Sequence, residues 1–194
     1  MMQSGTKKQL SVTIESHNLI LNPANLKFSI ELLAKHHNRE DFSCGNQQLN
    51  RYLQITASQD RQRNIAVPYI AIDLTSDRII GYYTLSMTSI NLGELPTSLV
   101  KKLPKSPLIG LTLIGRLAVS ENYKSMGWGK LLLLDALYKS LETSKRVASF
   151  AVIVDAIDEQ AIKFYQRFDF QSFPQQKFKL FRTMKNVSQA FNSN

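Results

Sequence analysis

LTLIGRLAV at residues 111–119 and KSMGWGK at residues 124–130 are the two stretches that decide the fold. The first predicts a β-strand whose internal glycine, Gly115, is typical of a bulge or of a close approach to its backbone. The second is a glycine turn that leads into an apolar helix over residues 129–143. Free N–H groups and the positive end of the dipole make a helix start an anion site. Two glycines beside lysines are also common in ordinary tight turns, so the pattern alone leaves both interpretations open.

Outward from this junction, apolar spacing, β-branched runs and turn residues predict further elements on both sides. The predicted elements are, in chain order, an amphipathic helix at 42–63, strands at 69–74, 78–85 and 111–119, a helix at 129–143, a strand at 148–154, a helix opening at 155–159, and strands around 170–173 and 178–181. This order predicts an α/β fold built on one sheet.

The chain has 194 residues, of which 43% are hydrophobic, and this is enough for one domain with a full core. We expect an N-terminal extension at 1–24, the folded domain at 25–185 and a polar C-terminal tail at 186–194. No stretch approaches the roughly 20 apolar residues of a membrane span, and the first residues lack the apolar block of a signal peptide. The sequence therefore predicts a cytoplasmic protein that does not enter a membrane.

Charge and cysteine content narrow the choice of ligand. The formal net charge of +9 predicts an anionic ligand or partner. The single cysteine, Cys44, and the three histidines form no cluster at metal-ligand spacing, so we expect no metal. Cys44 lies in a turn without an activating base nearby, which favours a structural role over a nucleophilic one.

The strand and the glycine turn resemble those of the GCN5-related N-acetyltransferase (GNAT) family, in which an Arg-Leu-Ala-Val strand precedes a Gln/Arg-x-x-Gly-x-Gly/Ala turn. Here the turn is Lys124-x-x-Gly127-x-Gly129, with Lys124 in the place of Gln or Arg. The resemblance implies a central mixed, mostly antiparallel twisted sheet flanked by helices, with acetyl-CoA as donor at the splayed central strands. It also implies that backbone groups of the strand hold the pantetheine arm and amides of the turn hold the pyrophosphate. The cofactor-binding residues expected from it are Leu117, Ala118, Val119, Lys124, Ser125, Met126, Gly127, Trp128, Gly129, Lys130 and Phe164.

Residues 154–170 are similar to the second half of the same family. In many members a tyrosine at the position of Tyr165 protonates the departing thiolate, so the resemblance implies that Tyr165 is the general acid. Without the resemblance, an aromatic residue at helical spacing favours a place in the core. Asp169 stands where the family usually has glycine, and aspartate tolerates the left-handed backbone better than most residues.

A narrower resemblance covers residues 28–182. The elements that carry it, His36-His37, Phe42-x-Cys44-Gly45, Ala66-Val67-Pro68 and the run 80–86, are similar to the acetyltransferase toxins of bacterial toxin–antitoxin modules. It implies acetylation of the α-amine of aminoacyl-tRNA, arrest of translation and neutralisation by a ribbon-helix-helix antitoxin, and it is compatible with a homodimer.

The chemistry of an α-amine agrees with such an acceptor, because its pKa near 8 leaves part of it neutral at pH 7. No acidic residue stands at a recognisable base position, and His36 and His37 stay open as bases. Basic clusters, including one at 177–182, are candidates for tRNA phosphates, although a generally basic surface explains them equally well. The substrate-contacting candidates are Lys35, His36, Arg39, Arg61, Arg63, Lys101 and Lys102.

Two other functions fit the sequence. In the first, the enzyme class is the same but the acceptor is a small-molecule amine or a protein amine. The high positive charge slightly disfavours this function. In the second, the chain is a non-catalytic binding module that has kept the fold. Such a module is expected to have lost the glycine turn or the tyrosine, and both are present here.

Overall fold

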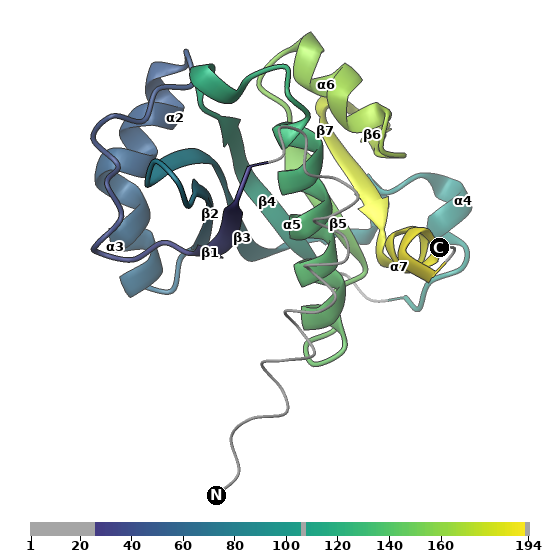
Figure 1. Cartoon of the computed structure of the whole chain (residues 1–194). Coiled ribbons are helices and arrows are strands. Elements are labelled where there is room, and N and C mark those ends of the chain that lie inside the picture. The colour runs from purple at the N-terminus through teal and green to yellow at the C-terminus, as the bar shows by residue number, and fades with distance from the viewer. Residues whose placement is uncertain (1–25, 106–107, 193–194) are drawn as a thin grey trace, which may run out of the picture.

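The computed structural model describes residues 26–105 and 108–192, and the predicted extension at 1–24 lies outside them. One seven-stranded sheet with the order β1-β2-β3-β4-β5-β7-β6 forms the centre (Figure 1). Among the strands of the described residues, only β4 and β5 are parallel neighbours. The strands are β1 (Phe28–Leu32), β2 (Val67–Asp73), β3 (Arg78–Asn91), β4 (Leu108–Val119), β5 (Ala151–Asp155), β6 (Gln171–Phe173) and β7 (Gln176–Thr183). The predicted fold class, a mixed and mostly antiparallel sheet flanked by helices, is confirmed.

The helical segments alternate with these strands. The amphipathic segment predicted at 42–63 is helical from Gln47, where the Asn46 side chain accepts N–H bonds from Gln48 and Leu49 and so caps the helix. The segments are α2 (Gln47–Arg51), the π-helix η1 (Tyr52–Thr56), α3 (Ala57–Gln62), the 3₁₀ turns η2 (Leu92–Glu94) and η3 (Glu121–Tyr123), α4 (Thr97–Val100), α5 (Trp128–Ser144), α6 (Glu159–Gln166) and α7 (Met184–Asn192). No helix in the described ranges is long and apolar enough to cross a bilayer.

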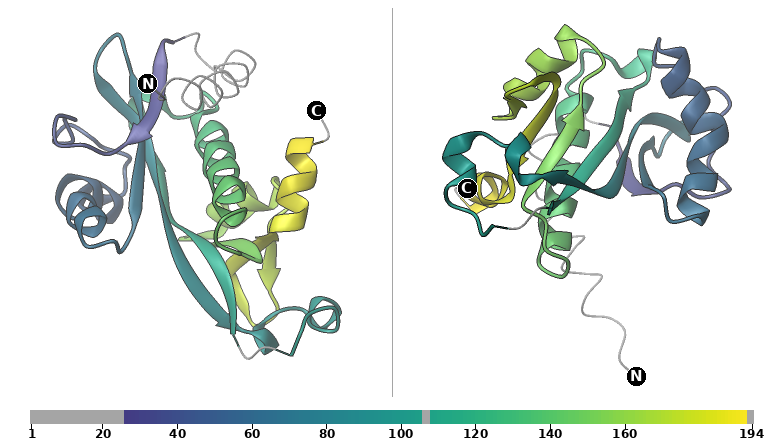
Figure 2. Two further views of the ribbon diagram at one scale, coloured as in Figure 1. Left: turned by 90° about the horizontal axis from the view of Figure 1, so that it is seen from below. Right: turned by 180° about the vertical axis from the view of Figure 1, so that it is seen from behind.

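The two faces of the sheet are covered by different helices. Helices α5 and α7 lie on one face, and α2, η1 and α3 lie on the other (Figure 2). Leu132, Leu133 and Leu137 of α5 are buried in the larger core, together with Val152 and Leu180 of the sheet. The broad apolar surface of α5 is explained by this position, because the helix packs against the sheet over much of its length.

The chain beyond residue 184 differs from the prediction. The segment expected to be a polar tail from residue 186 is helical up to Asn192. Val187 is fully buried, and Phe191, four residues later, packs its ring edge-on against Tyr138 of α5 at 5.7 Å. Two apolar residues one turn apart in a polar segment are a weak sequence signal for a helix. Their packing partner is α5, which is distant in sequence.

A β-bulge at Gly115 confirms the expectation for the glycine inside the strand. Thr84 pairs with Arg116 and Leu85 pairs with Ile114, so Gly115 is the extra residue on β4. A Cβ atom at this position would lie 3.2 Å from Thr84 Oγ1. The bulge bends the strand where it approaches the site described next.

Candidate active site

A cleft opens where β4 and β5 separate. The two strands pair only from Thr112–Val152 to Ile114–Val154, although β4 continues to Val119. Residues 115–119 of β4 therefore have β3 on one side and no strand on the other. The cleft has a volume of about 350 Å³ and is lined by Leu117, Lys124, Gly129, Phe164 and Tyr165, among others. The splayed central strands implied by the resemblance are present, with an unpaired β4 edge in the gap.

The glycine turn enters α5 through two left-handed residues. Ser125 has φ 61° and Gly127, the N-cap of α5, has φ 85°. Gly127 takes this conformation without the steric penalty that a Cβ atom brings. The first backbone N–H groups of a 17-residue helix follow directly after it. The sequence thus folds locally into a left-handed turn followed by a helix start, a geometry whose free N–H groups suit an anion.

Side chains around the turn divide between cleft, solvent and core. Lys124 and Lys130 are exposed, and Lys124 also lines the cleft with its Nζ beside Gly45. Met126 is exposed. The indole of Trp128 is only 1% exposed and lies edge-on to Phe28 at 4.9 Å. The Ala118 side chain is buried on the face that α2 and α3 cover. Trp128 and Ala118 can therefore offer only their backbone to a ligand in the cleft.

Helix α6 forms the other wall of the cleft and carries Phe164 and Tyr165. The helix begins after Asp158, whose carboxylate accepts the Ala161 N–H at 2.7 Å. Tyr165 is 7% exposed and lines the cleft, and burial raises the pKa of its hydroxyl above the ordinary value. Phe164 lies 5.2 Å from the Tyr165 ring and reaches Gly129, where a Cβ atom would be 3.6 Å from the ring. Tyr165 is thus both a core residue and a residue of the cleft, so the two interpretations of the sequence do not exclude each other.

Sequence reasoning missed four polar residues of the cleft lining: Arg116, Asp155, Asp158 and Gln160. The Arg116 guanidinium carbon lies 3.6 Å from the centre of the Tyr52 ring, and the Tyr52 hydroxyl donates to Asp60 at 2.9 Å. No ion pair joins Arg116 to a carboxylate in the part of the chain that the structure describes. A charged residue directly after an apolar strand was the available signal for Asp155, and strand alternation around Leu117 was the signal for Arg116.

The basic residues predicted to contact substrate have different environments. Arg39 donates to Ser58 Oγ at 2.6 Å, and Arg61 donates to the Leu33 carbonyl. These two side chains tie the 33–39 loop to α3 and so have structural partners. The remaining candidates are exposed: Lys35, His36, Arg63, Lys101 and Lys102.

Glu31, His36 and His37 form the one cluster with metal-ligand spacing among the described residues. His37 Nδ1 accepts the Ala34 N–H at 2.9 Å, so the proton is on Nε2, which lies 2.9 Å from Glu31 Oε1. Both ring nitrogens are therefore occupied by hydrogen bonds that hold the loop after β1. Neither His36 nor His37 lines the cleft. Cys44 is not an activated nucleophile either, because burial raises the pKa of its thiol and keeps it protonated.

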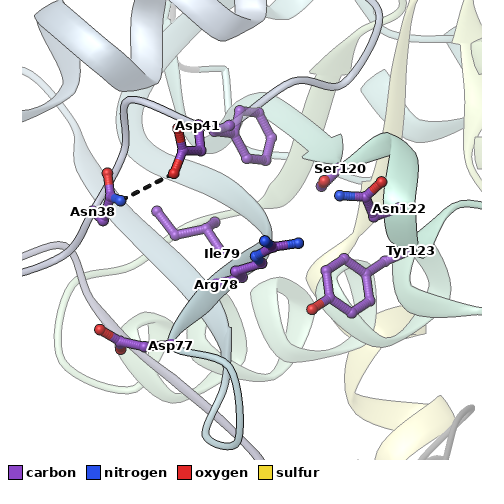
Figure 3. A pocket seen from close by; sticks show the side chains of 9 residues that line it. Asn38, Asp41, Asp77, Arg78, Ile79, Ser120, Asn122 and Tyr123 are labelled. Atoms are coloured by element: carbon purple, nitrogen blue, oxygen red, sulfur yellow. Dashed lines mark hydrogen bonds between the residues drawn. The ribbon is translucent and has the colours of Figure 1, made fainter.

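A smaller cavity of about 170 Å³ lies at the turn between β2 and β3 (Figure 3). Asn38 donates to Asp41 at 3.2 Å on one side of it, and Arg78 and Tyr123 contribute to its lining. None of the predicted site residues reaches this cavity. Of the predicted cofactor residues, Leu117, Lys124, Gly129 and Phe164 instead line the β4–β5 cleft.

Comparisons with known proteins show which family this chain resembles. The model of the acetyltransferase (GNAT) family matches residues 32–170. A tRNA-acetylating toxin of Mycobacterium tuberculosis is 26% identical over 146 residues, which cover 75% of this chain and 86% of the relative. The structure of AtaT complexed with acetyl-methionyl-tRNAfMet is 28% identical and has a TM-score of 0.79, with 85% of this chain and 99% of that chain covered. A crystal structure of AtaTR bound with AcCoA is 26% identical and has a TM-score of 0.74, with 84% and 98% covered.

The family match runs from the last residue of β1 to the residue before β6, and it contains the bulged strand, the glycine turn and Tyr165. More than half of the chain is thereby matched, and the sheet order and the cleft agree with the match. The chain belongs to the GNAT family of acetyltransferases.

Proposed function

We propose that this protein transfers the acetyl group of acetyl-CoA to the α-amine of aminoacyl-tRNA and thereby blocks translation. The observation that carries the proposal is the position of Tyr165 in the β4–β5 cleft, beside the turn at the start of α5. The tRNA acceptor is supported by the similarity to the tRNA-acetylating toxin and to AtaT in its complex with acetyl-methionyl-tRNAfMet. The net charge of +9 also suits a polyanionic acceptor.

The residues of the cleft fit acetyl-CoA. The unpaired edge of β4 at Leu117 and Val119 offers backbone groups to the amides of a pantetheine arm. The amides after Gly127, with Lys124 and Lys130 nearby, suit a pyrophosphate. Gly129 has no Cβ atom, so the Phe164 ring of α6 can lie close to the start of α5, 3.6 Å from the place a Cβ atom would take. When bound, acetyl-CoA supplies a thioester whose carbonyl carbon is attacked and whose sulfur departs.

Tyr165 provides the proton for the departing sulfur. Its raised pKa keeps the hydroxyl protonated through the physiological pH range. As the carbon–nitrogen bond forms and the carbon–sulfur bond breaks, Tyr165 Oη gives its proton to the sulfur. It recovers one from solvent after the acceptor nitrogen has lost its own, so the protons balance.

Arg116 favours the reactive form of the acceptor amine. Its charge lies in the same cleft as Tyr165 and is not neutralised by an ion pair within the described ranges. A fixed positive charge lowers the pKa of a nearby ammonium group, which increases the neutral fraction of an amine that already titrates near 8. No histidine base is required in this scheme, and His36 and His37 lie outside the cleft.

The proposal extends to partners and location. A toxin of this kind needs an inhibitor, and the resemblance to the toxin group favours a ribbon-helix-helix antitoxin. We place the enzyme in the cytoplasm, where charged tRNA occurs. Co-expression with a small neighbouring gene of that pattern is expected to restore growth to cells that this protein arrests.

The direct test is incubation of the purified protein with labelled acetyl-CoA and a set of charged tRNAs. We expect N-acetylaminoacyl-tRNA for at least one amino acid and none with uncharged tRNA. Absence of label from every aminoacyl-tRNA, with transfer to a small amine or a protein instead, would show that the acceptor is assigned incorrectly.

A further inference from the structure

A second basic site lies at the free edge of β7, apart from the acetyl-CoA cleft. A cavity of about 440 Å³ is enclosed by α4, by the loop after α6 and by the start of α7. It shares no lining residue with the β4–β5 cleft. The pairing of β6 with β7 reaches Gln171–Phe181, so Arg182 and Thr183 face this cavity where no further strand covers them.

Arg182 is the buried charge of this cavity. The residue is 6% exposed, and its Nη2 lies 3.3 Å from both Asp169 Oδ2 and the Asn186 carbonyl. Its Nε has no hydrogen-bond partner among the described residues. A buried guanidinium normally has its donors satisfied, because an unpaired buried donor costs free energy. One long ion pair to an otherwise exposed Asp169 leaves Arg182 incompletely compensated.

Further positive groups converge on the same cavity from distant parts of the chain. Lys102 follows α4 and Lys185 lies in the first turn of α7, and both are exposed. The positive end of the α7 dipole also points to this place. Lys102 belongs to the basic segment Lys101–Lys102 and Arg182 to the basic segment 177–182. The two residues are 80 positions apart in sequence. Asp169 is the one acidic residue of the lining.

Part of the cavity lining is an apolar wall. It consists of the half-buried Leu99, Leu103 and Phe150 and of Phe181, which is 1% exposed. Cationic groups beside a partly aromatic wall suit a ligand that has an anionic group next to a flat apolar one, and a nucleotide has both. An acidic peptide would use the cations but would leave this wall without a planar partner.

We propose that this cavity holds a nucleotide of the RNA acceptor, with a phosphate against Lys102, Lys185 and Arg182 and its base against the apolar wall. The inference rests on the proposed function, since it assumes an RNA acceptor. The location agrees with it, because Asp169 and Gln171 of the lining follow the helix that carries Tyr165 by only a few residues. Phe150 and Thr183 of the cavity lie at the start of β5, whereas Asp155 of the cleft lies at its end, so an acceptor must be extended to reach both places, as an RNA strand is.

The test measures binding of a fluorescent acceptor-stem RNA hairpin that ends in an unpaired CCA, without acetyl-CoA. We expect Lys102→Ala and Lys185→Ala each to weaken binding about 3- to 10-fold and to lower the slope of log affinity against log salt by about 0.7–0.9. Lys27→Ala removes an equal charge at the opposite edge of the sheet and is the matched control. Wild-type affinity and salt slope in both cavity variants would overturn the proposal.

Two further arms keep the result interpretable. Arg182→Gln, checked for native melting, is expected to weaken RNA binding at least as much as Lys102→Ala. Displacement of the hairpin by micromolar AMP or inorganic phosphate would assign the cavity to a free phosphate ligand and contradict the RNA assignment. If the wild-type protein acetylates no aminoacyl-tRNA while the cavity variants still lose RNA affinity, the proposed function fails and the RNA site remains.

Discussion

The guanidinium of Arg116 lies over the ring of Tyr52, with its central carbon 3.6 Å from the ring centre. Tyr52 belongs to the π-helical segment between α2 and α3, and its hydroxyl is fixed by Asp60 at 2.9 Å. A long flexible side chain is thereby held in one orientation at the wall of the cleft. Arginine stacks in this way because its guanidinium is planar and weakly hydrated.

Arg116→Lys keeps the charge but loses the planar stack and the fork of donors. We expect the guanidinium to hold the acceptor by a charge-assisted hydrogen bond in addition to its charge, so loss of that bond should raise KM for aminoacyl-tRNA about tenfold. KM for acetyl-CoA is expected to stay near the wild-type value, because the donor site lies on β4 and α5. Steady-state kinetics with each substrate varied in turn checks this, and an equal rise in both constants would point to a general distortion of the cleft.

Tyr165→Phe removes the proposed acid and keeps the ring that packs against Phe164 and Phe170. We expect kcat to fall by about 100-fold or more, within the range that general acids contribute. The melting temperature should hardly change. Tyr138→Phe is the matched control, since Tyr138 packs on Phe191 of α7 outside the cleft. Retention of wild-type kcat in Tyr165→Phe would remove the general-acid role.

The pH dependence of the reaction follows from two ionisations. The acceptor amine must be neutral, so kcat/KM is expected to rise with pH until the amine, with its pKa near 8, is deprotonated. Tyr165 must be protonated, and burial raises its pKa above the ordinary value of about 10, so its proton is retained throughout this range. The profile should therefore rise and level off up to about pH 9.5. A falling limb below that pH in enzyme that remains folded would contradict the assignment of Tyr165.

Gly81 on β3 has no room for a side chain. A Cβ atom there would lie 2.5 Å from the Ala118 carbonyl oxygen and 2.8 Å from Leu132 Cδ1. We expect Gly81→Ala to lower the free energy of unfolding by about 1–3 kcal/mol, the usual cost of overpacking. Gly93→Ala meets no atom within 4 Å and should leave the stability unchanged. Urea denaturation of both variants makes the comparison, and equal stability would show that β3 and β4 yield to the added methyl group.

Helix α7 depends on Val187, which is fully buried beneath it. Val187→Ala is expected to lower the free energy of unfolding by about 2 kcal/mol, because it leaves a cavity between α7 and the sheet. Ala190→Ser, on the exposed side of the same helix, should change it by less than about 0.5 kcal/mol. Denaturant titration measures both. A negligible effect of Val187→Ala would mean that the segment adds nothing to the core in solution.

The elements that the sequence predicted are those with local causes. Asn46 and Asp158 cap helices with their own side chains, Gly127 takes a left-handed turn, and the β-branched and aromatic residues of 78–85 form a strand. Asp169 has φ 59°, as expected for an aspartate in the place of a glycine. Such preferences act over a few residues, so a single sequence is sufficient to recognise them.

The tertiary structure decided what depends on distant partners. Pairing of β4 with β5 stops after three residues and opens the cleft, and nothing in either strand alone signals this end. The same long-range packing places Arg116 on Tyr52, gives Arg39 and Arg61 structural hydrogen bonds, and brings Lys102 to Arg182. The sequence by itself determined the glycine turn before α5, because backbone geometry at Gly127 is local. The chain had to fold before charges far apart in sequence acquired their neighbours, since burial and electrostatic pairing depend on distances in space.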